Sequence, residues 1–254
     1  MHDQIIIALS GRKNAGKNTL SQIIGAEFYN LHNKSFYECS FADDLKRFCI
    51  DTLGLEEKQC YGSDSDKNTL TRYKWENVES FLAWKFGSRQ FSDSFGDIQL
   101  LKGLHGSLRN DYYERVESRL WKPLGIRSGA MSGRDIMQLF GTELIRENFG
   151  NIWADATIRR IKRQSDLLAT IVDNRFPNET ESILNEPNGY VIRLTRSPFG
   201  FEDQHPSEAS LDNFDWNRPK CFVLDNQLMS IEQQNEAVKG ILHQILQEIK
   251  NVVS

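Results

Sequence analysis

A glycine-rich turn near the start of the chain carries the clearest chemical signal. Residues 11–17 read Gly-Arg-Lys-Asn-Ala-Gly-Lys and fit the pattern G-x-x-x-x-G-K. An apolar run at 4–9 comes before the turn and a helix-forming segment at 19–28 follows it. Glycines let successive backbone N–H groups point toward one spot, and a helix N-terminus adds partial positive charge. The turn therefore predicts a cradle for the phosphate oxygens of a nucleoside triphosphate.

The residues of this turn divide into two expected roles. The backbone of the turn would surround the phosphates, and Lys17 would reach the outer phosphates as a point charge. Asn18 stands where Ser or Thr usually holds Mg²⁺, so either its amide oxygen ligates the metal, directly or through water, or the hydroxyl of Thr19 replaces it. A plain strand–helix turn with a surface lysine is the competing interpretation. The predicted ATP-binding residues are Gly11, Asn14, Ala15, Gly16, Lys17, Asn18 and Thr19.

Polar residues also follow two later apolar runs. After the run at 167–172, residues 173–179 read Asp-Asn-Arg-Phe-Pro-Asn-Glu. Asp173 at a strand end can hold Mg²⁺ through water, and Arg175 can bind a phosphate with two hydrogen bonds. After the run at 190–195 we expect Arg196 to act as a transition-state cation. An ordinary acidic turn and solvent-exposed arginines are the alternatives.

The segment 133–149 predicts a helix with two unlike faces. One face is apolar, and a set of Arg134, Gln138, Gly141 and Thr142, with Arg146 at its margin, lies opposite. A solvated face is the usual explanation of such polarity. Glu and Lys normally fill a solvated face, however, whereas this set suits a base, a sugar and a phosphate. Lys46, one turn into an earlier helix, is either near the acceptor phosphate or an exposed lysine.

The spacing of apolar runs predicts the fold class. Runs at 4–9, 35–41, 167–172, 190–195 and 221–224 alternate with helical segments, which predicts an α/β fold of three layers around a five-stranded parallel sheet. Ligands in such folds bind at the carboxyl ends of the strands. We interpret 1–254 as a single domain, with 55–130 a mostly helical insertion that has helical periodicity at 73–86, and 197–218 a candidate lid loop.

Composition excludes several classes of partner. The 254 residues carry a net charge of -4, which argues against a broad basic surface for a nucleic acid polymer or a membrane. No apolar run approaches the roughly 20 residues of a membrane span. The four cysteines show no C-x-x-C pair and are interpreted as reduced packing thiols. We expect a cytoplasmic protein, and leave open whether it forms a homodimer.

An ordered series of segments resembles the deoxynucleoside monophosphate kinases of tailed bacteriophages, members of the phosphate-loop kinase fold. The stretch 173–179 and the His-Pro-Ser-Glu stretch at 205–208 are the specific ones. The others are 10–17, 41–46, Arg134 through Gln138, Gly141 with Thr142, Arg146, Trp153, Gly189, Arg193 and Arg196. The resemblance covers roughly 5–55 and 130–250 and leaves the middle of the chain unmatched.

The resemblance implies ATP as donor, Mg²⁺ as cofactor and a deoxynucleoside 5′-monophosphate as acceptor, in the host cytoplasm if the chain is phage-encoded. The implied catalytic residues are Lys17, Arg175 and Arg196, and the implied metal-binding residues are Asn18 and Asp173. The implied substrate-binding residues are Lys46, Arg134, Gln138, Thr142, Arg146, Trp153, Asp173, Arg175, Glu179, His205 and Glu208.

Two other functions remain open at this point. One is a kinase of the same fold that acts on dephospho-coenzyme A or phosphomevalonate. The other is a non-enzymatic nucleotide-dependent switch, which should carry a guanine-reading Asn-Lys-x-Asp loop after a late strand. Residues 225–228 read Asp-Asn-Gln-Leu and do not match that loop.

Overall fold

The computed structural model describes residues 4–77, 128–144, 146, 150–197 and 210–253. The chain forms two compact units, Met1–Phe41 with Thr157–Ser254, and Ala42–Ala156. Most of the predicted insertion at 55–130 and of the predicted lid at 197–218 lies outside the described residues. The single-domain organisation, the insertion and the lid therefore stay predictions.

The first unit is built on a parallel sheet of five strands, in the order β2-β5-β1-β6-β7. All six residues of β1 are buried, as an apolar central strand covered on both faces requires. The predicted α/β fold around a five-stranded parallel sheet is confirmed. The strand bounds are β1 Ile5–Ser10, β2 Phe36–Cys39, β5 Leu168–Asn174, β6 Gly189–Leu194 and β7 Cys221–Leu224.

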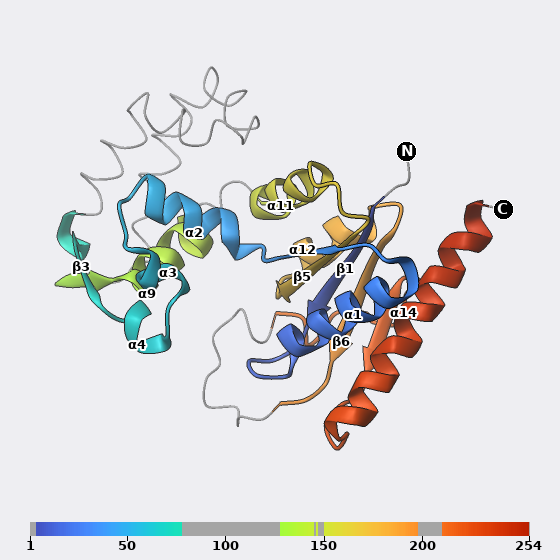
Figure 1. The fold of residues 1–254 in the computed structure, drawn as a ribbon. Coiled ribbons are helices and arrows are strands. Elements are labelled where there is room, and N and C mark those ends of the chain that lie inside the picture. Colours follow the sequence, from blue (N-terminus) through green and yellow to red (C-terminus); the bar gives the residue numbers. More distant parts are fainter. Residues whose placement is uncertain (1–3, 78–127, 145, 147–149, 198–209, 254) are drawn as a thin grey trace. The chain divides into compact units, whose positions relative to one another are not determined.

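Helices cover both faces of this sheet (Figure 1). Helices α1 (Lys17–His32) and α14 (Ile231–Val253) pack together on one face, and α12 (Pro177–Leu184) packs against β1 and β6 on the other. The core under α1 and α14 includes Ile5, Ile7, Leu9, Leu20, Ile24, Phe28, Val238, Leu242 and Ile245. Among the described residues, no helix is both long enough and apolar enough to cross a bilayer.

The second unit is smaller and has its own core. An antiparallel pair of strands, β3 and β4, packs with short helices around Phe48, Leu53, Ile136, Leu139, Phe140 and Trp153. The elements are α2 (Ala42–Asp51), α3 (Glu57–Tyr61), α4 (Asp64–Lys67), β3 (Leu70–Lys74), the 3₁₀ turn η1 (Trp75–Asn77), β4 (Ala130–Ser132), α9 (Gly133–Gln138) and the π-helical η2 (Leu139–Leu144). Helix α11 (Ile152–Lys162) begins in this unit and ends in the first one.

Two sequence expectations in this unit are corrected in part. The helix predicted at 73–86 begins instead with the end of β3, where Lys74 pairs with Ala130. That partner lies far along the chain, so a local helical period could not reveal it; residues 78–86 lie outside the described part. The helix predicted at 133–149 begins at Gly133 as expected, is α-helical to Gln138 and continues as the wider turn of η2. The consecutive residues Leu139, Phe140 and Gly141 are all buried there, which displaces Gly141 from the predicted polar face.

Candidate functional site

Five parallel strands bring their carboxyl ends to one edge of the sheet, and the predicted motifs of the first unit follow those ends. The glycine-rich turn follows β1, the stretch 173–179 overlaps the end of β5, and Arg196 comes two residues after β6 ends. The turn after β7 begins at Asp225. This is the edge at which open α/β sheets bind ligands.

The turn after β1 takes a backbone shape that glycine permits. Gly11 has φ 153° and Gly16 has φ 102°, and Asn14 is left-handed at φ 59°. A Cβ atom at Gly11 would lie 3.0 Å from the Cβ of Leu194 and 3.2 Å from the Leu194 carbonyl oxygen. The first glycine therefore lets the turn lie directly on β6, and the second begins α1 with a left-handed cap.

The lysine of the turn lies over the turn itself. Lys17 is 8% exposed, and its Nζ donates to the carbonyl oxygens of Gly11 at 2.7 Å and Arg12 at 2.8 Å. Its charge is therefore held beside the backbone of the turn and not in bulk water. Asn18 and Thr19 are exposed on the first turn of α1, next to this charge.

A buried asparagine after β7 holds the turn in place, a role that its position in the sequence did not indicate. The Nδ2 of Asn226 donates to the Ala15 carbonyl oxygen at 3.0 Å and to Oε1 of Gln234 at 2.7 Å. Its Oδ1 accepts from the backbone N–H of Arg196 at 2.8 Å. Asn226 is fully buried. It therefore joins the turn, the exit of β6 and helix α14 in one network, which residue type and spacing alone do not signal.

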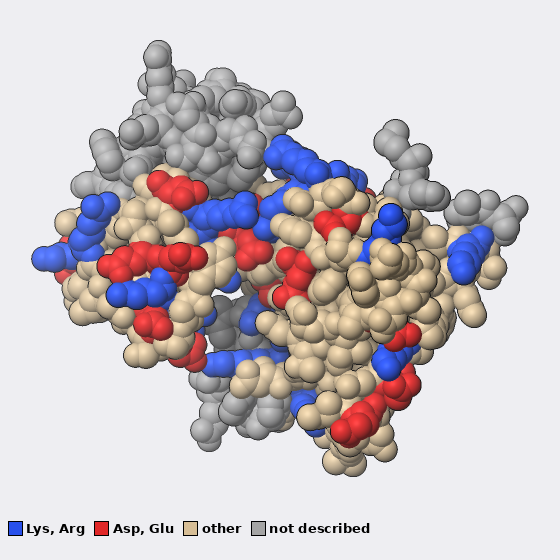
Figure 2. Space-filling view, in the orientation of Figure 1, with Lys and Arg blue, Asp and Glu red and all other residues tan. Residues whose placement is uncertain are grey.

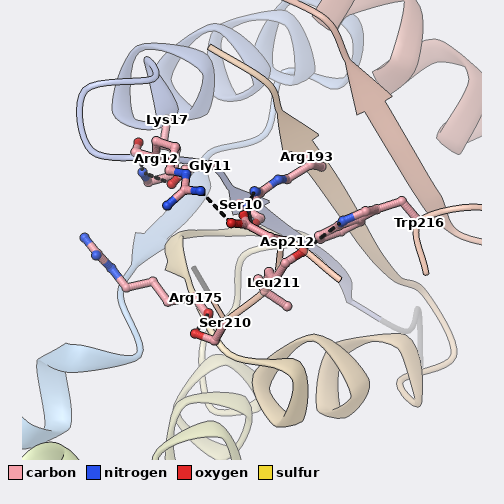
Figure 3. A network of polar contacts seen from close by, with 10 residues as sticks. All are labelled: Ser10, Gly11, Arg12, Lys17, Arg175, Arg193, Ser210, Leu211, Asp212 and Trp216. Carbon is pink, nitrogen blue, oxygen red and sulfur yellow. Dashed lines mark hydrogen bonds and ion pairs between the residues drawn. The ribbon is translucent and has the colours of Figure 1, made fainter. Parts of the chain in front are cut away.

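A carboxylate joins two arginines beside the turn (Figure 3). Oδ2 of Asp212 lies 2.5 Å from Nη2 of Arg12, and its Oδ1 lies 3.3 Å from Nη2 of Arg193. Nη1 of Arg193 also donates to Oγ of Ser10, at 3.0 Å. Arg193 is therefore the β6 arginine that lies at the turn.

Arg196 lies just after the end of β6, as predicted from its position, and its side chain contacts the backbone of the loop after β7. Its Nη2 donates to the carbonyl oxygen of Met229 at 3.3 Å. Its neighbour Thr195 donates through Oγ1 to Oδ1 of Asp225 at 2.5 Å, and this hydrogen bond holds the pKa of Asp225 below its usual value. The transition-state role of Arg196 stays a prediction.

The stretch 173–179 forms a rigid start to helix α12. Oε2 of Glu179 accepts from the backbone N–H groups of Arg175 at 2.9 Å and Phe176 at 3.1 Å, and Pro177 occupies the first turn. Glu179 is 2% exposed. These bonds make Glu179 the cap of α12, and its predicted contact with substrate stays a prediction.

The same stretch is tied to two other segments. Oδ1 of Asp173 accepts from the backbone N–H of Phe41 at 2.7 Å, and its Oδ2 accepts from the hydroxyl of Ser40. The Arg175 carbonyl oxygen accepts from the hydroxyl of Ser210 at 3.0 Å. The exit of β5 is thus fixed to the exit of β2 and to the turn that carries Asp212.

Three predicted residues of the second unit have contacts within it. Nη2 of Arg134 pairs with Oδ1 of Asp64 at 2.7 Å, and Nζ of Lys46 lies 4.4 Å from the centre of the Tyr61 ring. Trp153 is 2% exposed and its Nε1 donates to the Gly141 carbonyl oxygen at 3.1 Å. Trp153 is thus part of the core of this unit, and its predicted contact with substrate stays a prediction. The roles of the other residues stay predictions: Lys46, Arg134, Gln138, Thr142 and Arg146 in this unit, and His205 and Glu208, which lie outside the described residues.

The described residues hold no group of three His, Cys, Asp or Glu side chains that could bind a metal ion. The candidate donors are the exposed amide of Asn18, the hydroxyl of Thr19 and the carboxylate of Asp173. These are hard oxygen donors, and Mg²⁺ at phosphate sites takes one or two protein ligands beside substrate phosphates and waters. The donor set therefore fits Mg²⁺ bound together with a nucleotide, and does not fit a metal caged by protein alone.

The charges on the visible face are mixed. Figure 2 shows Lys and Arg side chains interspersed with Asp and Glu, without one broad basic field. Cations for an anionic ligand must therefore converge locally, as Arg12 and Arg193 do.

The four cysteines are free thiols, of which Cys39, Cys49 and Cys60 are buried. Burial raises the pKa of Cys49 well above its usual value.

Comparison with known proteins identifies relatives of one kind. The chain is 26% identical over 207 residues to a protein of Acanthamoeba polyphaga mimivirus named "Putative deoxynucleotide monophosphate kinase", and the match covers 82% of each chain. It is 25% identical over 224 residues to the deoxynucleoside-5'-monophosphate kinase of Escherichia phage T5, covering 82% of this chain and 85% of that one. No family model matches the chain. The resemblance predicted from the sequence is confirmed.

Proposed function

We propose that the chain is an ATP-dependent kinase that transfers the γ-phosphoryl group to a deoxynucleoside 5′-monophosphate and forms the diphosphate. The observation that carries this proposal is the turn after β1, with Lys17 held against its backbone and Arg193 of β6 beside it. The two relatives named as kinases of this substrate class support the same activity.

The donor would bind at the carboxyl end of β1. Backbone N–H groups of the turn and the start of α1 would surround the phosphates, where the helix dipole favours negative charge. Lys17 would exchange its bonds to the Gly11 and Arg12 carbonyl oxygens for bonds to phosphate oxygens. Because the lysine is already placed at the turn, this exchange needs a change of side-chain direction and no movement of α1.

The acceptor would react without a general base. The second pKa of a phosphate monoester is about 6, so the attacking oxygen is already ionised at neutral pH. The protein must therefore align two polyanions and neutralise their charge. Arg175, at the exit of β5, would hold the acceptor phosphate.

The metal proposed for this reaction is Mg²⁺. Asn18 or Thr19 on α1, and Asp173 through water, would hold it. Bound together with the nucleotide, the metal would supply positive charge against the phosphate oxygens of the donor. Asp173 already accepts from Ser40 and Phe41, which fixes the direction of its carboxylate toward the exit of β2.

A substrate panel tests the proposed reaction. Purified chain with ATP and Mg²⁺ is incubated with each deoxy- and ribonucleoside monophosphate and with dephospho-coenzyme A, and ADP formation is followed with product identification. We expect ADP only with nucleoside monophosphates, the deoxy forms among them. Turnover restricted to dephospho-coenzyme A, or ADP release that no acceptor stimulates, would contradict the proposal.

Two variants assign the donor and acceptor sides. Lys17→Ala should lower kcat/KM by roughly a hundredfold or more, since it removes a charge that acts on the transferring group. Lys13→Ala, on an exposed residue of the same turn, is the matched control. Arg175→Ala should raise KM for the acceptor more than KM for ATP. Retained turnover in Lys17→Ala would refute the donor site, and equal changes in both KM values would move Arg175 to the donor side.

A further inference from the structure

The carboxylate of Asp212 lies between two guanidinium groups that come from distant parts of the chain. Arg12 belongs to the turn after β1, and Arg193 is the fifth residue of β6. The side chains of Arg12, Arg193 and Asp212 are 22%, 14% and 38% exposed. One oxygen of the carboxylate faces each arginine, so the two arginines converge on a single anion.

The position of Arg193 is fixed by contacts other than this carboxylate. Its Nη1 donates to Oγ of Ser10, the last residue of β1, and its guanidinium carbon lies 5.5 Å from the centre of the Trp216 ring. Nε1 of Trp216 in turn donates to the Leu211 carbonyl oxygen at 3.3 Å. Arg193 would therefore keep its place beside the turn if Asp212 moved away.

The turn that carries Asp212 is also anchored without it. Leu211 is 2% exposed, and the hydroxyl of Ser210 donates to the Arg175 carbonyl oxygen. Figure 3 shows Arg12 and Arg193 directed at the carboxylate, whereas the guanidinium of Arg175 extends away from it. Rotation of the Asp212 side chain alone would release the two guanidinium groups from the carboxylate.

We propose that Arg12 and Arg193 form a binding subsite for a phosphoryl group of a nucleotide, and that Asp212 fills this subsite when no nucleotide is bound. The inference rests on the proposed function, because the ligand is a phosphoryl group of one of its two nucleotides. A carboxylate and a phosphoryl group both present two oxygens to guanidinium donors, and the phosphoryl group carries more charge. A partly exposed ion pair contributes little free energy, so displacing the Asp212 carboxylate from the two arginines costs little.

Equilibrium binding tests this subsite without turnover. Isothermal titration calorimetry is run with tripolyphosphate, with ATP and with a deoxynucleoside monophosphate on the wild-type chain and on Asp212→Asn. We expect Asp212→Asn to bind at least one of these ligands roughly three- to thirtyfold more tightly, because the ligand no longer displaces a carboxylate. Asp215→Asn is the control: it removes the same charge from an exposed residue three positions after Asp212, and it should leave the affinity unchanged.

The ligand that binds more tightly to Asp212→Asn shows whether the phosphoryl group belongs to the donor or to the acceptor. Tighter binding of tripolyphosphate and ATP assigns the subsite to the donor, and tighter binding of the monophosphate alone assigns it to the acceptor. Arg193→Gln should weaken binding of the same ligand. In the double variant with Asp212→Asn, the gain from Asp212→Asn should disappear, since the subsite is no longer complete.

Weaker or unchanged binding of all three ligands by Asp212→Asn would overturn the inference and leave Asp212 as a structural link between the turns. Melting temperature is measured for each variant, and Asp212→Ala replaces Asp212→Asn if the latter does not fold. Failure of the proposed function is distinguishable, because it would appear as absent phosphoryl transfer in the wild-type chain whatever Asp212→Asn does to anion affinity.

Discussion

The buried amide of Asn226 supports the phosphate-binding turn, and Asn226→Ala is the most informative perturbation of this site. The substitution removes two donated bonds, to Ala15 and Gln234, and one accepted bond, from Arg196. Alanine supplies neither a donor nor an acceptor, and a fully buried position gives water little access. The groups that faced the amide therefore lose their partners.

The expected cost follows from those groups. A buried polar group left without a partner costs about 1–3 kcal/mol, and the backbone N–H of the half-buried Arg196 lies at the low end of that range. We expect Asn226→Ala to lower the free energy of unfolding by about 3 kcal/mol. For a chain of this length, that corresponds to a fall in melting temperature of roughly 6–12 °C. KM for ATP should rise, because the Ala15 backbone lies in the turn.

Thermal unfolding followed by circular dichroism measures the stability, and ADP formation measures KM. Asn226→Asp is the sharper variant, since it replaces the Nδ2 donor by an oxygen that faces the Ala15 carbonyl oxygen and Oε1 of Gln234. It should be at least as destabilising as Asn226→Ala. Gln227→Ala is the matched control, because its side chain is exposed and should cost less than about 0.5 kcal/mol. If Asn226→Ala were as stable as Gln227→Ala, the supporting role of the amide would be refuted.

Two further predictions concern the neighbouring loops. Glu179→Ala should lower the free energy of unfolding by about 1–2 kcal/mol, since it removes the buried acceptor of two backbone N–H groups at the start of α12. Glu181→Ala is the control, because the carboxylate of Glu181 is partly exposed and pairs with Arg218. Equal melting temperatures for the two variants would exclude the capping role of Glu179. The lowered pKa of Asp225 means that the carboxylate stabilises the fold above its usual pKa of about 3.9 and loses this effect as the pH falls through the lower, folded-state value. The free energy of unfolding of Asp225→Asn, measured in urea, should therefore be lower than that of wild type at pH 7, and the difference should shrink toward pH 3. A difference that grows at acid pH would mean that the pKa of Asp225 is not lowered by folding.

Local sequence determined the elements whose signal lies within a few neighbouring residues. The run of β1, the turn at 11–17 and the start of α1 follow from apolar continuity and glycine positions, and all three are present. The last strand was predicted at 221–224 and is observed at Cys221–Leu224. A parallel sheet then follows, because alternating strands and helices bury their apolar faces only in that arrangement.

Tertiary structure alone decided which polar groups meet. Arg12, Arg193 and Asp212 converge because β1 and β6 are neighbours in the sheet and the turn at 210–213 returns to their ends. In the same way, Asp173 meets the exit of β2 through the pairing of β2 with β5, and Asn226 meets the turn of β1 across the sheet edge. The strand β3 and the wide turn of η2 depend equally on distant partners and on burial. Spacing along a chain records local backbone preference, whereas the direction of a long polar side chain depends on neighbours that only folding supplies.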